Sequence, residues 1–505
     1  MQIEPQATAF AKRYARGEAQ VVSTTLVSDL ETPVSAFLKI AGTRPLSFLL
    51  ESVEGGAVRG RYSIIGLHPD IVWRTAAGKA EINRTARQSA HNFTPCNQAP
   101  LAALRALITE SRIELPDALP PMAAGIFGYL GYDMVRLMEE LPQPNPDPIG
   151  IPDAVLVRPT IVVVFDAVKD TITVVTPVRP ESGVSAETAF MRARERLSTI
   201  IDALDAPLPH SPPDFQAGPL TVWPSSNTTA AEYERMVNVA KEYIAAGDIF
   251  QVVLSQRFEA PFELPPFALY RALRRVNPAP FLYFLDFGGF SIVGSSPEIL
   301  VRVREGTVTI RPLAGTRPRG TTPQQDKALE SELLADKKER AEHLMLLDLG
   351  RNDVGRVART ATVKVTDQFL VERFSQVMHI VSNVEGQLDG KYDALDALAA
   401  GFPAGTVSGA PKVRAMEIID ELERDKRGLY AGSVGYFSAA GELDSCIVLR
   451  TALIKDAMMY VQAGAGIVAD SNPKSEQQEC VNKAKALFRA AEEAKRFAST
   501  ARRGQ

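Results

Sequence analysis

The pattern of apolar and polar positions predicts both helices and strands along the chain. Apolar residues at helical spacing indicate four long helices, at residues 185–204, 230–247, 326–358 and 475–498. Runs rich in β-branched and aromatic residues indicate strands, at residues 45–53, 62–69, 160–178, 281–303, 308–315, 378–386 and 432–468. A turn at Lys169 and Asp170 would fold 160–178 as a hairpin, and Gly288 and Gly289 would divide 281–303 into two strands.

These strands follow one another through short turns and do not alternate strictly with helices. Such meanders favour an α+β fold over a doubly wound parallel sheet. We expect large antiparallel β-sheets packed as a sandwich, with helices outside and two intimately associated domains. Residues 206–226 are rich in proline, which predicts a linker between an N-terminal domain at 1–205 and a second domain at 227–495.

The composition is that of an ordinary globular protein. The 505 residues are 45% hydrophobic and 23% charged, with a net charge of −4, and neither half has the basic excess of a nucleic-acid-binding protein. The three cysteines, Cys96, Cys446 and Cys480, are too scattered for a disulfide framework. The first residues lack the apolar core of a signal peptide, and no apolar run has the length of a membrane helix. We therefore expect a cytoplasmic protein with no membrane or nucleic-acid partner.

Two pairs of glutamates are spaced by three residues on predicted helices. Glu339 and Glu342 form one pair and Glu476 and Glu479 the other, so each pair lies on one helix face. A solvated charged face is the plainer interpretation of either pair alone. Carboxylates on two separate helices could instead hold Mg²⁺, which prefers oxygen ligands and usually bridges to an anionic substrate.

A short glycine-rich segment, Gly464, Ala465 and Gly466, follows a predicted strand. A dinucleotide-binding turn would open straight into a helix, whereas Pro473 delays the next helix here. The segment could present backbone N–H groups to an anion, or it could simply bend the chain between a strand and a loop. His379 lies inside a predicted strand, where a structural role is more common than a catalytic one.

Ten segments of the second half of the chain together resemble the chorismate-utilising enzymes, which include anthranilate, aminodeoxychorismate, isochorismate and salicylate synthases. They occur in the family's order and cover nearly all of residues 226–490. The segments are residues 247–257, 277–285, 294–303, 312–320, 341–353, 378–386, 402–412, 430–437, 444–452 and 462–487. Each match alone would be weak, but the ordered set is very specific.

The resemblance implies roles for individual residues. Glu342 and Glu479 correspond to the family's Mg²⁺ ligands, with Glu339 and Glu476 as neighbours. The implied chorismate-binding residues are Gly315, Thr316, Tyr430, Arg450, Gly464, Ala465, Gly466 and Lys483. Glu298 corresponds to the general acid, and Gln251, His379 and Thr406 are the other implied catalytic positions. The implied reaction adds ammonia at C2 of chorismate with the help of Mg²⁺ and eliminates pyruvate to give anthranilate, the first step of tryptophan biosynthesis.

Two positions discriminate among members of the family. Relatives that add water carry a lysine where this chain has Gln251, because water must lose a proton to attack whereas ammonia attacks as the free amine. Aminodeoxychorismate synthases carry a nucleophilic lysine where this chain has Ala314. Both positions favour the anthranilate-forming members. An aminodeoxychorismate-forming subunit and a catalytically dead tryptophan-binding protein are the alternatives.

The N-terminal half also resembles parts of the tryptophan site of feedback-inhibited relatives. The residues implied for L-tryptophan are Glu51, Ser52, Pro280, Phe281, Leu282 and Cys446. A plain core strand is the alternative interpretation of residues 45–53. None of the three cysteines stands in the Gly-x-Cys-x-Gly elbow of a glutaminase. We therefore expect a separate glutamine amidotransferase subunit to supply ammonia, within a heterotetramer.

Overall fold

A computed structural model describes residues 1–54, 58–209, 224–374 and 377–498. Its α-helices are α1 (Ala7–Ala15), α2 (Pro33–Ile40), α3 (Pro100–Glu110), α4 (Ala186–Asp205), α5 (Ala230–Ala246), α6 (Pro266–Val276), α7 (Pro323–Ala335), α8 (Lys337–Gly355), α9 (Ala394–Gly401), α10 (Lys412–Leu422) and α11 (Pro473–Ala494).

The strands of the first half are β1 (Gln20–Val27), β2 (Ser47–Glu54), β3 (Val58–Ala76), β4 (Lys79–Asn83), β5 (Thr94–Pro95), β6 (Gly125–Leu130), β7 (Ala154–Asp166) and β8 (Thr171–Val178). Those of the second half are β9 (Ser225–Ser226), β10 (Gln251–Pro261), β11 (Phe281–Asp286), β12 (Ser291–Ser296), β13 (Ile299–Arg304), β14 (Thr307–Ile310), β15 (Leu313–Pro318), β16 (Lys364–Arg373), β17 (Val377–Gln387), β18 (Gly409–Ala410), β19 (Ser433–Ser438), β20 (Leu443–Ile447), β21 (Thr451–Lys455) and β22 (Met458–Ile467).

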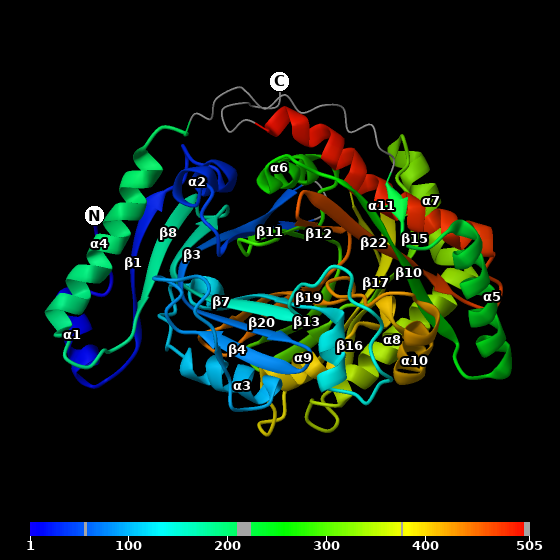
Figure 1. The fold of residues 1–505 in the computed structure, drawn as a ribbon, viewed down its shortest axis with the longest axis horizontal. Helices are drawn as coiled ribbons and strands as arrows, with labels where there is room; N and C mark the ends of the chain where they lie inside the picture. The colour runs from blue at the N-terminus through cyan, green and yellow to red at the C-terminus, as the bar shows by residue number, and fades with distance from the viewer. Residues whose placement is uncertain (55–57, 210–223, 375–376, 499–505) are drawn as a thin grey trace.

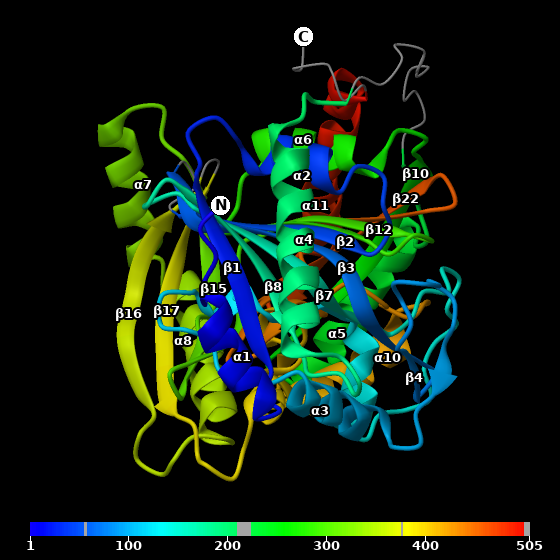
Figure 2. The same cartoon turned by 90° about the vertical axis from the view of Figure 1, so that its left-hand side faces the viewer.

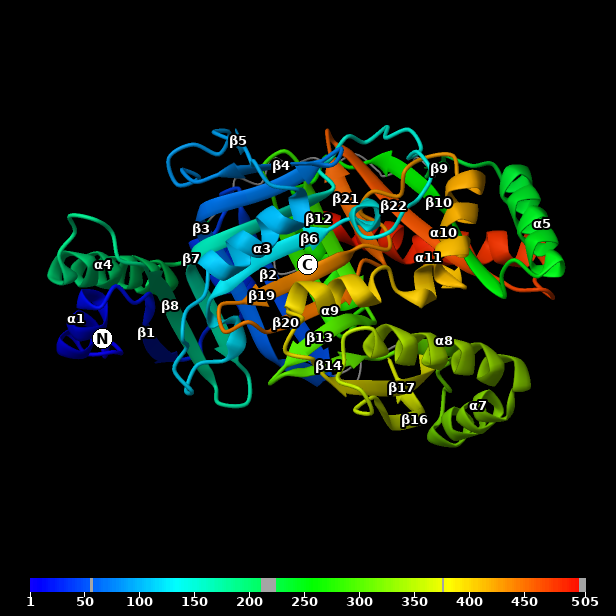
Figure 3. The ribbon, with the colours of Figure 1, turned by 90° about the horizontal axis from the view of Figure 1, so that it is seen from below.

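The strands form two layers that pack face to face, with helices on both outer surfaces (Figure 1). Helices α6 and α11 lie over one outer surface. At one end of the molecule, α1 and α4 pack beside the ladder of β1 and β8 (Figure 2). Seen from below, α3, α8 and α9 lie over the opposite outer surface (Figure 3). The expected α+β fold, with antiparallel sheets in a sandwich and helices outside, is confirmed.

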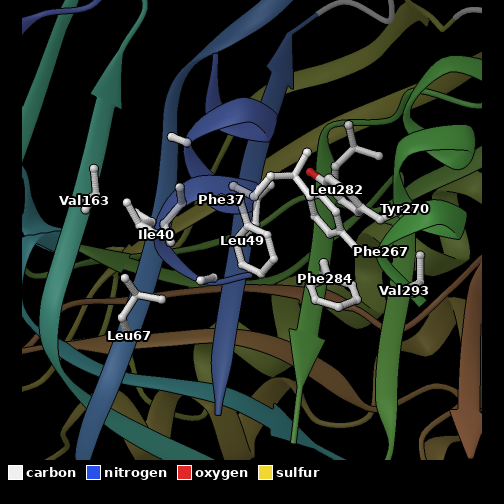
Figure 4. Close-up of a cluster of buried hydrophobic side chains, with 14 of the residues drawn as sticks. Phe37, Ile40, Leu49, Leu67, Val163, Phe267, Tyr270, Leu282, Phe284 and Val293 are labelled. Carbon is white, nitrogen blue, oxygen red and sulfur yellow. The ribbon is translucent and has the colours of Figure 1, made fainter. Parts of the chain in front are cut away.

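Neighbouring residues of β2 face two different cores, because side chains alternate across a strand. Phe48 belongs to an apolar cluster between the two layers, which also contains Phe127 of β6. Leu49 points the other way, into the cluster beneath α2 and α6, where the rings of Phe37 and Phe267 stack at 4.5 Å (Figure 4). A strand buried on both faces carries consecutive apolar residues, as β2 does at Phe48, Leu49 and Leu50.

Strand pairing joins the two halves of the chain. Strand β2 of the first half pairs with β11 of the second, and β6 pairs with β19. The ladders thus continue across the predicted boundary at 206–226. The division into domains stays a prediction, and residues 210–223 of the predicted linker lie outside the described residues.

Helices α4, α5 and α11 confirm three of the four predicted helices, and β7 and β8 confirm the hairpin. The prediction of one helix over 326–358 is wrong. Two helices, α7 and α8, meet at Asp336, whose carboxylate accepts hydrogen bonds from the backbone N–H groups of Lys338 and Glu339. An aspartate that caps a new helix in this way satisfies N–H groups that would otherwise lack partners.

The prediction of two strands over 281–303 is also wrong. The region contains β11, β12 and the start of β13, with the hairpin turn at Gly288 as expected. Pro297 interrupts the chain between β12 and β13, and β13 then pairs with β14 and β20. No helix of the described ranges combines the length and the apolarity needed to cross a membrane.

Candidate active site

A pocket of about 1080 Å³ lies where β10, β15, β17 and β22 meet α8 and α11. Most of the predicted site residues line it. They are Gln251, Glu298, Gly315, Thr316, Glu339, Glu342, His379, Thr406, Tyr430, Arg450, Gly464, Gly466, Glu476, Glu479 and Lys483. The pocket has the size of a small-molecule site, and its lining mixes apolar surface with convergent charged groups.

Glu298 is a buried carboxyl in the turn between β12 and β13. The hydroxyl of Thr406 donates to both carboxyl oxygens, at 3.2 and 3.1 Å, and the backbone N–H of Leu313 is a further partner. Burial outweighs these hydrogen bonds and raises the pKa of Glu298 to about 8. The group is therefore protonated at neutral pH and can act as an acid.

His379 of β17 has its ring fixed at one nitrogen. Nδ1 lies 2.9 Å from the carbonyl oxygen of Gly315 and 3.1 Å from the hydroxyl of Thr316. Since a carbonyl only accepts, Nδ1 carries the hydrogen and Nε2 is left as an acceptor, with no protein partner among the described residues. Burial, with a contribution from nearby Arg450, lowers the pKa of His379 to about 4. The imidazole is therefore neutral, with a free lone pair.

Arg450 supplies an unpaired positive charge in the pocket lining. Burial lowers the pKa of its guanidinium, and no carboxylate of the described part of the chain forms an ion pair with it. Its backbone has a φ of 47°, in the left-handed region that non-glycine residues seldom adopt. A partly buried cation that lines a pocket without a carboxylate partner can be neutralised by an anionic ligand, so this position suits a carboxylate.

The glycine-rich segment does not form the predicted bend between a strand and a loop, and its binding of an anion stays a prediction. Strand β22 runs through it to Ile467, and Gly464 and Gly466 pair with Ser255 and Val253 of β10. A Cβ atom on Gly464 would lie 2.8 Å from the hydroxyl of Tyr430. On Gly466 it would lie 2.6 Å from Nε2 of Gln251. The two glycines therefore leave room above the strand for pocket side chains.

Ala465, predicted in the same segment, points to the opposite face of β22. Its side chain is buried in the apolar cluster that contains Val237 of α5 and Ile418 of α10. This placement follows from strand alternation, because only every second side chain of β22 can face the pocket.

Carboxylates from α8 and α11 converge on one part of the pocket. Burial raises the pKa of Glu342, and the charges of Glu339 and Glu479 raise it further. Nε2 of Gln251 donates to Glu342 at 3.1 Å, and Lys483 of α11 lies 2.7 Å from Glu479. Lys483 also donates to the carbonyl oxygen of Gly464 at 2.9 Å.

No group of three or more acidic, histidine or cysteine side chains close enough to share a metal ion exists within the described ranges. The pair Glu342 and Glu479 is nevertheless compatible with Mg²⁺. This ion usually takes one or two protein carboxylates and completes its shell with water and substrate oxygens. The mutual repulsion that raises the pKa of Glu342 is the electrostatic setting that a divalent cation would relieve.

Several lining residues were not predicted. Gln462 lies in β22 and donates to the hydroxyl of Ser255 at 2.8 Å, while Asn277 and Pro278 approach from the loop before β11. Gln462 directly precedes the glycine-rich segment, so strand alternation from Gly464 would have placed it on the same face. Lys338, next to Glu339, also lines the pocket, but no pattern in the sequence indicated its position there.

The residues predicted to bind tryptophan come together elsewhere, on the paired strands β2 and β11. Phe281 pairs with Ser52, and Leu282 pairs with Glu51. The Ser52 hydroxyl donates to the carbonyl oxygen of Tyr62 at 3.0 Å. Glu51 is buried and forms an ion pair with Arg274 of α6, at 2.6 Å. Cys446 and Phe281 belong to the apolar cluster between the layers.

Comparisons with known sequences agree on one family. The model of the chorismate binding enzyme family matches residues 60–489. The chain is 58% identical over 499 residues to anthranilate synthase component 1 of Cereibacter sphaeroides, covering 98% of this chain and 99% of that protein. It is 48% identical over 470 residues to the same component of Pseudomonas putida, covering 92% and 93%.

Solved structures give the same grouping. Anthranilate synthase component I from Streptococcus pneumoniae TIGR4 is 38% identical and superposes with a TM-score of 0.74, covering 92% of this chain and 98% of that one. MenF, the menaquinone-specific isochorismate synthase from Escherichia coli, superposes with a TM-score of 0.68 over 96% of this chain and 100% of that one. At 23% identity the likeness to MenF concerns the fold alone.

Proposed function

This chain belongs to the chorismate-binding enzyme family, among the anthranilate synthase component 1 proteins, and on that premise we propose that it aminates chorismate at C2 and then eliminates pyruvate to give anthranilate. The observation that carries the proposal is the presence in one pocket of a protonated buried carboxyl, Glu298, and an unpaired guanidinium, Arg450. The reaction needs an acid for its leaving group and a cation for its anionic substrate.

Chorismate is a dianion with one carboxylate on its ring and one on its enolpyruvyl group. Arg450 would hold the enolpyruvyl carboxylate, with Tyr430 and the open face of Gly464 shaping the space beside it. Gly315 and Thr316, which both contact Nδ1 of His379, would lie beside the ring of chorismate. Lys483 adds a second positive charge to the pocket.

Amination joins nitrogen to C2 and expels the hydroxyl from C4. Hydroxide is a poor leaving group, so Glu298 would donate its proton and the hydroxyl would leave as water. Thr406 orients the carboxyl for this transfer. Ammonia needs no base to attack, which agrees with a glutamine at position 251 and an alanine at position 314.

Elimination of pyruvate requires removal of the proton on C2, which aromatises the ring. His379 lines the pocket, and its Nε2, which has no partner among the described residues, is the candidate for easing this step. The Nδ1–H donated to Gly315 keeps the ring in the required tautomer.

We propose Glu342 and Glu479 as the protein ligands of Mg²⁺, with Glu339 and Glu476 close by. The ion, when bound, would supply a Lewis acid for the ring carboxylate. Gln251 holds Glu342 in place through its hydrogen bond of 3.1 Å.

Two further parts of the proposal concern partners. Glu51, Ser52, Pro280, Phe281, Leu282 and Cys446 would bind L-tryptophan as a feedback inhibitor. A separate glutamine amidotransferase subunit would supply ammonia, which fits the component 1 naming of the relatives. We place the enzyme in the cytoplasm, in a heterotetramer with that subunit.

The test is incubation of the purified chain with chorismate, Mg²⁺ and an ammonium salt. We expect fluorescent anthranilate and an equal amount of pyruvate. An amino-chorismate that keeps its enolpyruvyl group, as the only product, would identify an aminodeoxychorismate-forming subunit instead. Complete inactivity with retained tryptophan binding would identify a catalytically dead sensor.

A further inference from the structure

A second, small cavity adjoins the substrate pocket at Glu298. Its volume is about 20 Å³, enough for a single water molecule. Glu298, Leu346 and Thr406 line both the cavity and the substrate pocket, so these three side chains form the partition between them. The acid of the proposed reaction therefore faces a separate space that substrate does not fill.

The far wall of this cavity includes Asp353 of α8. The side chain of Asp353 is only 5% exposed, and Oδ2 accepts from Nζ of Lys412 at 2.8 Å. Oδ1 is buried and has no hydrogen-bond partner among the described residues. A buried carboxylate oxygen needs a donor, and a water in the adjoining cavity is the donor that fits. The rest of the lining is Ile299, Leu300, Ile310, Pro312, Leu349, Gly350, Gly401, Ala404 and Gly405.

Glu298 must recover a proton in every turnover. In the proposed amination the C2–N bond forms, the C4–O bond breaks, and the hydroxyl leaves as water with the proton of Glu298. The new ammonium group on C2 then loses one proton to solvent. One proton must therefore return to the Glu298 carboxylate before the next chorismate reacts.

We propose that Asp353 returns this proton to Glu298 through a water held in the cavity between them. The Asp353 carboxylate takes a proton from solvent and gives it to the water, and the water passes one of its own protons to Glu298. Asp353 lies near the end of α8, beside the exposed residues Arg351 and Asn352. Lys412 holds its other oxygen in position. This inference rests on the proposed function.

Two variants interrupt the route in different ways. Asp353→Asn keeps an oxygen for Lys412 but cannot carry a proton. Gly350→Ala adds a methyl group that would lie 3.5 Å from Ile310 and 3.9 Å from Pro312, two residues of the cavity lining. These are ordinary contacts, so the methyl group should exclude the water without disturbing the fold. Gly355→Ala, on the same helix with open space around its Cβ, is the matched control.

The measurement is ammonium-dependent anthranilate formation by the full chain, in H₂O and in D₂O. Both variants should lower kcat by about tenfold or more, within the range of acid–base effects, and leave the KM for chorismate unchanged. The ratio of kcat in H₂O to kcat in D₂O should rise, because proton return becomes limiting. Gly355→Ala should match the parent, and the melting temperature of Gly350→Ala should equal or exceed the parent's.

A parent-like kcat and isotope ratio in both variants, with an active parent, would overturn the relay and leave the proposed function standing. An inactive parent would overturn the proposed function and the relay together. A loss in Asp353→Asn alone, with Gly350→Ala unaffected, would also overturn the relay, since Asp353 would then act without water in the cavity.

Discussion

Phe281 of β11 lies directly opposite Ser52 of β2, in an antiparallel ladder that joins the two halves of the chain. The loop before β11 contributes Asn277 and Pro278 to the substrate pocket, and the carbonyl of Asn277 accepts from the hydroxyl of Ser295 at 2.5 Å. A ligand in contact with Ser52 and Phe281 would therefore lie against a segment that reaches the substrate pocket within a few residues. If the proposed tryptophan site is correct, this continuity would connect it to the substrate pocket.

We expect Ser52→Phe to abolish or strongly weaken inhibition by tryptophan while leaving uninhibited activity close to that of the parent. The phenyl ring would occupy the space beside Phe281 on one face of the β2–β11 ladder, and the substitution would remove the hydroxyl that donates to Tyr62. The measurement is anthranilate formation against tryptophan concentration. Inhibition at parental concentrations of tryptophan would exclude Ser52 from the site.

The rate of amination should fall as pH rises through about 8, the pKa to which burial raises Glu298. A carboxyl that has lost its proton cannot protonate the leaving hydroxyl. Because free ammonia increases with pH, kcat should be compared at constant concentrations of ammonia. The pKa of His379, lowered to about 4, should leave the histidine neutral over this range. A flat profile between about pH 7 and 9 would argue against Glu298 as the acid.

Glu298→Gln should lower kcat by roughly a hundredfold or more, since the amide cannot donate an acidic proton. The amide still has an oxygen that can accept from Thr406, so folding should be retained. Thermal unfolding and chorismate-protection experiments check that point. A variant with nearly parental kcat would contradict the acid role.

Glu342→Gln or Glu479→Gln should raise the Mg²⁺ concentration needed for half-maximal activity by about tenfold or more. For Glu342→Gln, the fold without metal should be at least as stable as the parent's, because removing this carboxylate relieves its repulsion with Glu339 and Glu479. Glu492→Gln, at an exposed position of α11, is the control. An unchanged Mg²⁺ requirement would show that the altered residue is not a ligand of the metal.

Gly466→Ala should reduce activity because its Cβ would lie 2.6 Å from Nε2 of Gln251. Gln251 would have to move, and its hydrogen bond to Glu342 would be lost, at a cost of about 1–3 kcal/mol for the buried polar groups left unpaired. The Mg²⁺ requirement should rise together with the loss of kcat. Gly355→Ala, whose Cβ meets open space, should be nearly neutral.

The sequence predicted many elements correctly where periodicity was long and uninterrupted, as in α4, α5 and α11. It failed at Asp336, where helical spacing continues on both sides but the side chain caps a new helix. At Gly464 and Gly466 it left a continued strand and a bend both open, because glycine has a low strand propensity. Pairing with β10 keeps these glycines in a strand, and the pocket uses the space above them.

For the candidate site, the sequence predicted the residues but not their arrangement. The types of its residues were readable from the ordered motifs, including the carboxylates of α8 and α11 and the strand histidine. Their geometry was not. Neither the partnership of Glu298 with Thr406 nor the free Nε2 of His379 follows from local spacing, because each contact joins segments far apart in the chain.

The sequence by itself determined the α+β class, the antiparallel meanders and the family, because hydrophobic periodicity and ordered motifs are local properties of the chain. Only the tertiary structure decided which way each strand's alternate residues face. Strand register placed Ser52 opposite Phe281, turned Ala465 into the core and left Glu298 between two cavities. Register depends on how distant segments pack, and a shift of one residue would turn every side chain of a strand to the opposite face of the sheet.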